Sequence, residues 1–137
     1  MYQAHQSLKK IKGLVFYKLM GSGGGRGFSL KPDLSTYALL TVFSSQEAQN
    51  SFDKSSWYKN YASKSNKHVS AALIPIKGHG TWDGKSFNTA DYKFEKEDIV
   101  GVITRAAIKP HLAAYFWLFA GNISKMTKNQ PELLFSK

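Results

Sequence analysis

The sequence predicts an α+β domain of ferredoxin-like type, with helices on one face of an antiparallel sheet. Runs rich in β-branched and aromatic residues at 14–20, 37–43, 69–76 and 99–108 are typical of strands. Helical patterns precede the first strand and follow the second and the fourth. With 137 residues, 42% of them hydrophobic, the chain is long enough for one core, so we expect a single domain over residues 1–137.

Two helices are predicted from apolar spacing and from residues that begin or end helices. Residues 3–12 carry apolar side chains at helical spacing, and Gly13 should end that helix. The second helix should begin at Pro110, because proline is well tolerated in the first turn of a helix. Its apolar stripe repeats at i, i+3, i+4 and i+7 in Leu112, Tyr115, Phe116 and Phe119.

The segment after the second strand is predicted to form two short helices. Ser44, with Glu47 three residues later, predicts a capping box at the start of the first of them. One continuous helix would place Phe52 and Trp57 on different faces, so we expect a break near residues 55–56, where a serine can cap a second helix running to about residue 63.

The order of these elements predicts two ferredoxin-like units. Residues 1–96 would form the first unit without its first strand, and residues 97–137 would begin the second, with a strand starting at 133–135. Such sheets leave one face apolar, and pairing two of them face to face buries it. A homodimer is therefore expected.

The charge of the chain is strongly positive, at +10, and favours an anionic partner or a solubilising surface. Lysines make up 17 of the 19 basic residues, and only Arg26 and Arg105 could form the bidentate contacts that nucleic-acid readout favours. The lysines are also scattered, so a solubilising surface is preferred and a nucleic-acid binder is kept as a weaker alternative.

Several classes of protein are excluded by composition and spacing. The absence of cysteine removes disulfides and thiolate chemistry. No histidine pair has chelate spacing, the acids are few, and no Gly-x-Ser-x-Gly elbow is present, so hydrolytic chemistry is not supported. The longest apolar stretch, 112–120, is below the roughly 20 residues that cross a bilayer, and residues 1–12 lack a secretory signal. A soluble, cytoplasmic protein with at most peripheral membrane contact is expected.

Several blocks of this sequence resemble the spheroidene monooxygenase family. The most specific block lies between Lys18 and Phe28, within Gly-Leu-Val-Phe-Tyr-Lys-Leu-Met-Gly-Ser-Gly and the following Gly-Phe. Shorter matching pieces follow in order: Lys31-Pro32-Asp33, Tyr37-Ala38-Leu39-Leu40, Leu73-Ile74-Pro75, Gly80-Thr81-Trp82-Asp83-Gly84 with Phe87, Thr104-Arg105-Ala106, Lys109-Pro110, Phe116-Trp117 and Pro131-Glu132-Leu133-Leu134-Phe135. The resemblance covers essentially the whole chain.

The resemblance implies a haem-containing monooxygenase of acyclic carotenoids on a dimeric α/β-barrel scaffold, served by an electron-donor protein. Family members are longer, and related haem proteins take their iron ligand from the later half, so the chain is expected to be incomplete. Among the residues present, His111 is the preferred haem ligand and His79 the second, although a solvent-facing or capping role suits His111 as well. Arg105 or Lys18 would contact a propionate, and a structural ion pair is the alternative for Arg105.

An apolar pocket for the substrate is expected beside the aromatic residues. Its candidate residues are Phe16, Gly21, Gly23, Phe28, Tyr37, Trp82, Tyr115 and Phe116, and the aromatic members could equally be simple core. The glycine-rich run 21–27 fits neither nucleotide-binding spacing, and a plain hairpin loop or a lid over the substrate or haem edge is preferred. Besides the oxygenase, a non-catalytic ligand-binding or oligomer-forming domain on the same scaffold stays open.

Overall fold

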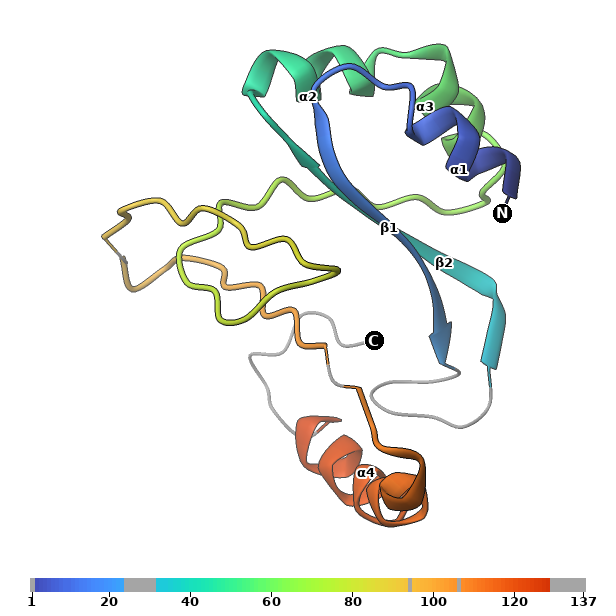
Figure 1. Cartoon of the computed structure of the whole chain (residues 1–137), viewed down its shortest axis with the longest axis vertical. Coiled ribbons are helices and arrows are strands. Elements are labelled where there is room, and N and C mark those ends of the chain that lie inside the picture. The colour runs from blue at the N-terminus through green and yellow to red at the C-terminus, as the bar shows by residue number, and fades with distance from the viewer. Residues whose placement is uncertain (1, 24–31, 94, 106, 129–137) are drawn as a thin grey trace. The chain divides into compact units, whose positions relative to one another are not determined.

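The computed structural model describes residues 2–23, 32–93, 95–105 and 107–128 (Figure 1). It divides into two compact units, one formed by Met1–Asn66 with Ala107–Lys137 and the other by Lys67–Ala106. All named helices and strands belong to the first unit: α1 (Tyr2–Leu8), β1 (Leu14–Gly23), β2 (Pro32–Phe43), α2 (Gln46–Asp53), α3 (Ser56–Ala62), the 3-10 turn η1 (Pro110–Leu112) and α4 (Ala113–Lys128). The α+β class predicted from the sequence is therefore confirmed.

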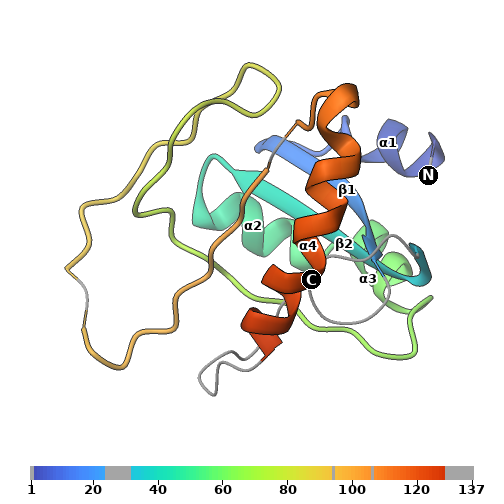
Figure 2. The same ribbon diagram turned by 90° about the horizontal axis from the view of Figure 1, so that it is seen from below.

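Strands β1 and β2 form a two-stranded antiparallel ribbon, and they lie side by side in both views (Figures 1 and 2). Lys18 pairs with Leu40 and Leu19 with Leu39, and the register shifts beside Val15. A shift of this kind bends and twists a strand locally. The strands predicted at 14–20 and 37–43 are confirmed and extend further toward their connection.

Helix α1 contacts β1 through His5 and Tyr17. The Tyr17 hydroxyl lies 3.2 Å from His5 Nδ1 and donates to the His5 carbonyl oxygen at 3.3 Å. Leu8, at the end of α1, is only 1% exposed. The chain then turns at Gly13, whose φ of +78° is favourable for glycine, and the Gly13 carbonyl accepts from the backbone N–H of Ser44 at 2.9 Å.

Helices α2 and α3 meet around one buried ring. Phe52 is 4% exposed, and its ring centroid lies 5.2 Å from those of Phe43 and Tyr58 and 5.7 Å from that of Trp57. The break between the helices falls where it was predicted, because the Ser55 side chain accepts from the Tyr58 N–H and caps α3. This aromatic cluster forms the core at the end of the ribbon where Figure 1 shows α1, α2 and α3.

The predicted capping residue of α2 was wrong by one position. Ser45, not Ser44, is the N-cap, and its hydroxyl accepts from the Ala48 N–H at 3.3 Å. The physical reason is that the Ser44 N–H is already engaged by the Gly13 carbonyl, which holds Ser44 at the end of the ribbon. A hydrogen bond from Ser45 lowers the pKa of the Glu47 carboxyl, so Glu47 supports the helix start from the first turn.

The second unit lacks the two strands that the sequence predicts there. Over its described residues, 67–93 and 95–105, neither 69–76 nor 99–105 is a strand. Val69 and Val102 are each 80% exposed. Strands form only where a neighbouring segment of backbone supplies a row of hydrogen-bond partners. In this unit the backbone hydrogen bonds either close turns or stand alone, such as the bond from the Ala90 N–H to the Pro75 carbonyl at 2.8 Å. The ferredoxin-like topology, and the division of the chain at residue 96, stay predictions.

Two tight turns organise this unit. Trp82 and Lys85 exchange backbone hydrogen bonds of 2.8 and 3.1 Å around Asp83 and Gly84, whose φ values of 53° and 75° match a type I′ turn. The other turn is closed by Asp98, which accepts from the Glu95 N–H at 2.9 Å. The pKa of Tyr92 is raised, mainly by its hydrogen bond to Asp98 and then by the negative charge of the Asp98 carboxylate.

The helix predicted at Pro110 is confirmed. Pro110 stands at the start of η1, and the chain passes directly into α4, the 16-residue helix at the red end of the colour scale in Figure 2. The strand predicted at 133–135 lies outside the described residues. Within the ranges that the structure describes, no helix is both long and apolar enough to cross a membrane.

Candidate functional site

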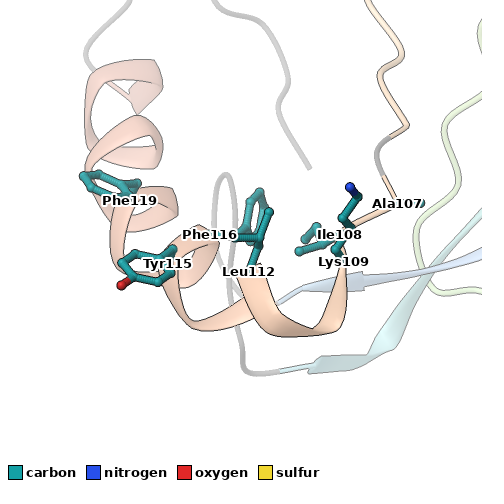
Figure 3. Close-up of a pocket in the computed structure, with 7 residues that line it drawn as sticks. All are labelled: Ala107, Ile108, Lys109, Leu112, Tyr115, Phe116 and Phe119. Carbon is teal, nitrogen blue, oxygen red and sulfur yellow. The ribbon is translucent and has the colours of Figure 1, made fainter.

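An apolar hollow lies at the junction of η1 and α4. It has a volume of about 530 Å³ and is lined by Ala107, Ile108, Lys109, Leu112, Tyr115, Phe116 and Phe119 (Figure 3). The lining residues come from the extended entry to the helix and from its first two turns, where the spacing of 3 and 4 residues places the side chains on neighbouring positions of the helix surface. The hollow is open, since Tyr115 and Phe119 are both 64% exposed.

The first turns of α4 are apolar on opposite sides. Ala113, Phe116, Trp117 and Ala120 are buried or half-buried, and the rings of Phe116 and Trp117 meet edge to face with centroids 5.1 Å apart. The other side carries Leu112, Tyr115, Leu118 and Phe119, which are exposed. A helix that packs only one face against its own core would carry polar residues there. The second apolar side therefore needs another explanation.

Two of the predicted pocket residues are brought together in this hollow, namely Tyr115 and Phe116. The aromatic stripe in the sequence signalled both. Five lining residues were not among the predicted candidates: Ala107, Ile108, Lys109, Leu112 and Phe119. Leu112 and Phe119 belong to the same stripe, so the helical periodicity could have found them, whereas 107–109 line the hollow only because the chain turns at Pro110.

His111, the preferred haem ligand, lies within η1 beside the hollow but is exposed and does not line it. Its position in the first turn accords with the solvent-facing alternative. Lys109, the N-cap residue of η1, does line the hollow and supplies the one cationic group among its described lining residues.

A second group of candidates lies on the ribbon. Phe16 is buried, and the Lys18 ammonium nitrogen lies 5.9 Å from the centroid of the Phe16 ring. At this distance the contact is a cation–π pair, which ties Lys18 to its own strand. Gly21 and Tyr37 are cross-strand partners, and Gly23 ends β1 opposite Pro32. Phe28 and the run 24–27 lie outside the described residues.

The remaining candidates belong to the second unit. His79 is exposed, and Trp82 is half-buried in the type I′ turn. Arg105 is exposed, so the burial that argued for an ion-pair or propionate partner is absent. The segment 99–105 is not a strand, and the contact of Arg105 with a propionate or an acidic partner stays a prediction.

These residues meet some of the requirements of a haem site. Flat apolar faces and a cation at one edge are what the ring system and a propionate require, and the apolar side chains with Lys109 supply both. An axial imidazole is not among the described lining residues, because His111 is turned to solvent. For other metal ions, the described part of the chain holds no group of three or more His, Asp or Glu side chains that could bind one.

The relatives of this chain share one name. The chain is 32% identical over 123 residues to a spheroidene monooxygenase of Rhodobacter capsulatus, in an alignment that covers 88% of this chain and 51% of the relative. The chain is a relative of the spheroidene monooxygenases. The resemblance seen in the sequence motifs is thereby confirmed.

Two further spheroidene monooxygenases agree with the first. That of Cereibacter sphaeroides is 28% identical over 121 residues, covering 88% of this chain and 37% of the relative. That of Rubrivivax gelatinosus is 28% identical over 110 residues, covering 80% of this chain and 43% of the relative. The chain therefore spans about half the length of these proteins or less. Neither a family model nor a solved structure matches it.

Proposed function

We propose that this chain is part of a haem-dependent monooxygenase of acyclic carotenoids or similar apolar isoprenoids, and that the hollow at the start of α4 receives part of the substrate. The observation that carries the proposal is the match over 123 residues to a protein named spheroidene monooxygenase. The relatives' names do not favour the alternative of a non-catalytic ligand-binding or oligomer-forming domain.

The chemistry of the hollow supports an apolar guest. A carotenoid chain has no charge to recognise, so its binding free energy comes from the apolar surface that it removes from water, at about 25 cal/mol per Å². Six of the seven lining residues offer aliphatic or aromatic surface. The open form of the hollow suits a guest longer than the hollow itself, which would lie partly inside it and extend beyond.

In this proposal the haem supplies the activation of dioxygen and the transfer of one oxygen atom to the substrate. The residues of this chain would orient the guest and exclude water from it. His111 is exposed but adjoins the lining in sequence, so as the proposed axial ligand it would have to turn toward the hollow. An electron-donor protein belongs to the same proposal, since monooxygenation takes two electrons and two protons to reduce the second oxygen atom of dioxygen to water. A homodimer belongs to it as well, because pairing two sheets face to face would bury their apolar faces.

The haem proposal predicts a visible spectrum. The chain expressed with haem supply should show a Soret band, and His111→Ala should shift or abolish that band because the axial bond is lost. His79→Ala tests the second candidate in the same way, and His68→Ala, at an exposed histidine that is not among the predicted ligands, is the control that should leave the band unchanged. Absorption spectra with and without added haem measure both effects. A Soret band that is equal in His111→Ala and His68→Ala would remove His111 as ligand, and no band at all would remove the haem proposal for this chain.

A further inference from the structure

The start of α4 presents an exposed apolar face, which is defined by Leu112, Tyr115, Leu118 and Phe119. Leu118 is 72% exposed and Tyr115 and Phe119 are each 64% exposed. All four residues fall within two helical turns, so their apolar surface is contiguous rather than scattered. A contiguous exposed patch of this kind marks a contact surface for another molecule or a membrane.

The charge of the sequence segment that carries this face indicates which occupant it would take. From Lys109 to the end of α4 at Lys128 the sequence contains Lys109, Lys125 and Lys128 and no Asp or Glu. The whole chain carries a charge of +10. A second copy would bring to this face the same segment, with its lysines and without a carboxylate to pair with them, whereas an anionic surface would be attracted.

We infer that this face rests on the surface of an anionic lipid bilayer, with the apolar side chains in the headgroup boundary and Lys109 at the level of the lipid phosphates. Helices that combine an apolar face with lysines bind membrane surfaces in this way, lying in the plane of the interface. Lysine suits the position because its aliphatic stem can lie along apolar surface while the ammonium reaches the headgroups.

This orientation also gives the hollow a supply route. Three of the four residues of the face, Leu112, Tyr115 and Phe119, line the hollow as well, so its open side and the membrane-contacting side coincide. An apolar polyene dissolved in a bilayer would then enter the hollow without crossing water. This last step rests on the proposed function, whereas the lipid contact itself does not.

Sedimentation with lipid vesicles tests the inference in the absence of carotenoid and haem. The chain should bind vesicles of phosphatidylglycerol and phosphatidylcholine in equal parts, and bind pure phosphatidylcholine vesicles much more weakly. Binding should weaken as sodium chloride is raised, because salt screens the attraction between lysines and lipid. Absence of binding to the anionic vesicles would overturn the inference.

Two pairs of variants locate the contact. Leu118→Ser should weaken vesicle binding roughly tenfold, and Leu34→Ser, a leucine that is 76% exposed on β2, should leave it unchanged. Lys109→Glu should also weaken binding roughly tenfold, whereas Lys54→Glu, at an exposed lysine that follows α2 in the same unit, should cost much less. Equal effects within the leucine pair would overturn the assignment to this face, and so would equal effects within the lysine pair.

Two further readouts separate this inference from its rivals. If light scattering shows that Leu118→Ser converts a dimer into a monomer, the face is an interface between copies and the lipid contact is overturned. If anionic vesicle binding persists while a carotenoid is left unoxidised, the proposed function fails and the lipid contact stands.

Discussion

Replacing Phe52 by alanine is expected to lower the free energy of unfolding by about 3–5 kcal/mol. The Phe52 ring is 4% exposed and has three aromatic neighbours within 5.7 Å, Phe43 from β2 and Trp57 and Tyr58 from α3. Truncation would remove the ring and leave a cavity that three elements enclose. Because whole domains are stable by only about 5–15 kcal/mol, this one change should remove a large share of the stability.

Urea denaturation followed by tryptophan fluorescence measures the effect, since Trp57 lies in the cluster. Tyr37→Ala is the control, because this aromatic residue of β2 is 51% exposed and its loss should change the free energy of unfolding by less than about 1 kcal/mol. A loss for Phe52→Ala no larger than for Tyr37→Ala would mean that the cluster is not the core of this unit.

Replacing Gly13 by alanine should lower the free energy of unfolding by about 2–4 kcal/mol. Gly13 has a φ of +78°, which costs a residue with a Cβ about 1–2 kcal/mol. The added Cβ would also lie 2.5 Å from the Ala48 Cβ and 3.3 Å from the Ser44 Oγ. The first distance is far inside normal contact, so α2 would have to move away from the turn.

Gly21→Ala is the matched control, because a Cβ added at Gly21 would meet no atom of the described residues within 4 Å and the change should be near neutral. The double variant Gly13→Ala with Ala48→Gly should recover the steric part of the loss but not the part due to the positive φ. Denaturation midpoints measured for all of these variants give the two contributions. Equal stability of Gly13→Ala and Gly21→Ala would contradict the close approach of α2 to this turn.

The features predictable from the sequence are those that depend on neighbouring residues. The strands at 14–20 and 37–43, the break before Ser56 and the helix start at Pro110 are each fixed by local propensity, a capping serine or a proline, and all four were found. The N-cap of α2 was placed one residue early because both Ser44 and Ser45 carry a suitable hydroxyl. Only the backbone bond from Ser44 to Gly13 decides between them.

Most of the features that were predicted wrongly depend on partners distant in the chain. Residues 69–76 and 99–105 have the composition of strands, but a strand needs a second strand beside it, and no local pattern tells whether one is present. The type I′ turn at Asp83-Gly84 was a local feature, and the dipeptide alone could have found it.

The part of the candidate site that lies on η1 and α4 could be predicted from the sequence. Tyr115 and Phe116 were found from the stripe that begins at Leu112, because one period describes a helix face. Lys109 was not found, since its place at the rim depends on the direction in which the chain enters η1. The exposure of the opposite side of α4 is likewise a property of packing that hydrophobicity alone does not give.

Incorporation of oxygen from ¹⁸O₂ into an acyclic carotenoid would show whether the hollow at the start of α4 serves carotenoid oxygenation. With haem and a reductant supplied in detergent, the protein should yield a product heavier by ¹⁸O in mass spectra. Leu112→Ala, which alters the hollow, should lower the yield roughly tenfold, whereas Leu34→Ala on β2 should match the unaltered protein. Carotenoid recovered without ¹⁸O, or equal yields from the two leucine variants, would contradict the assignment of this hollow to carotenoid oxygenation.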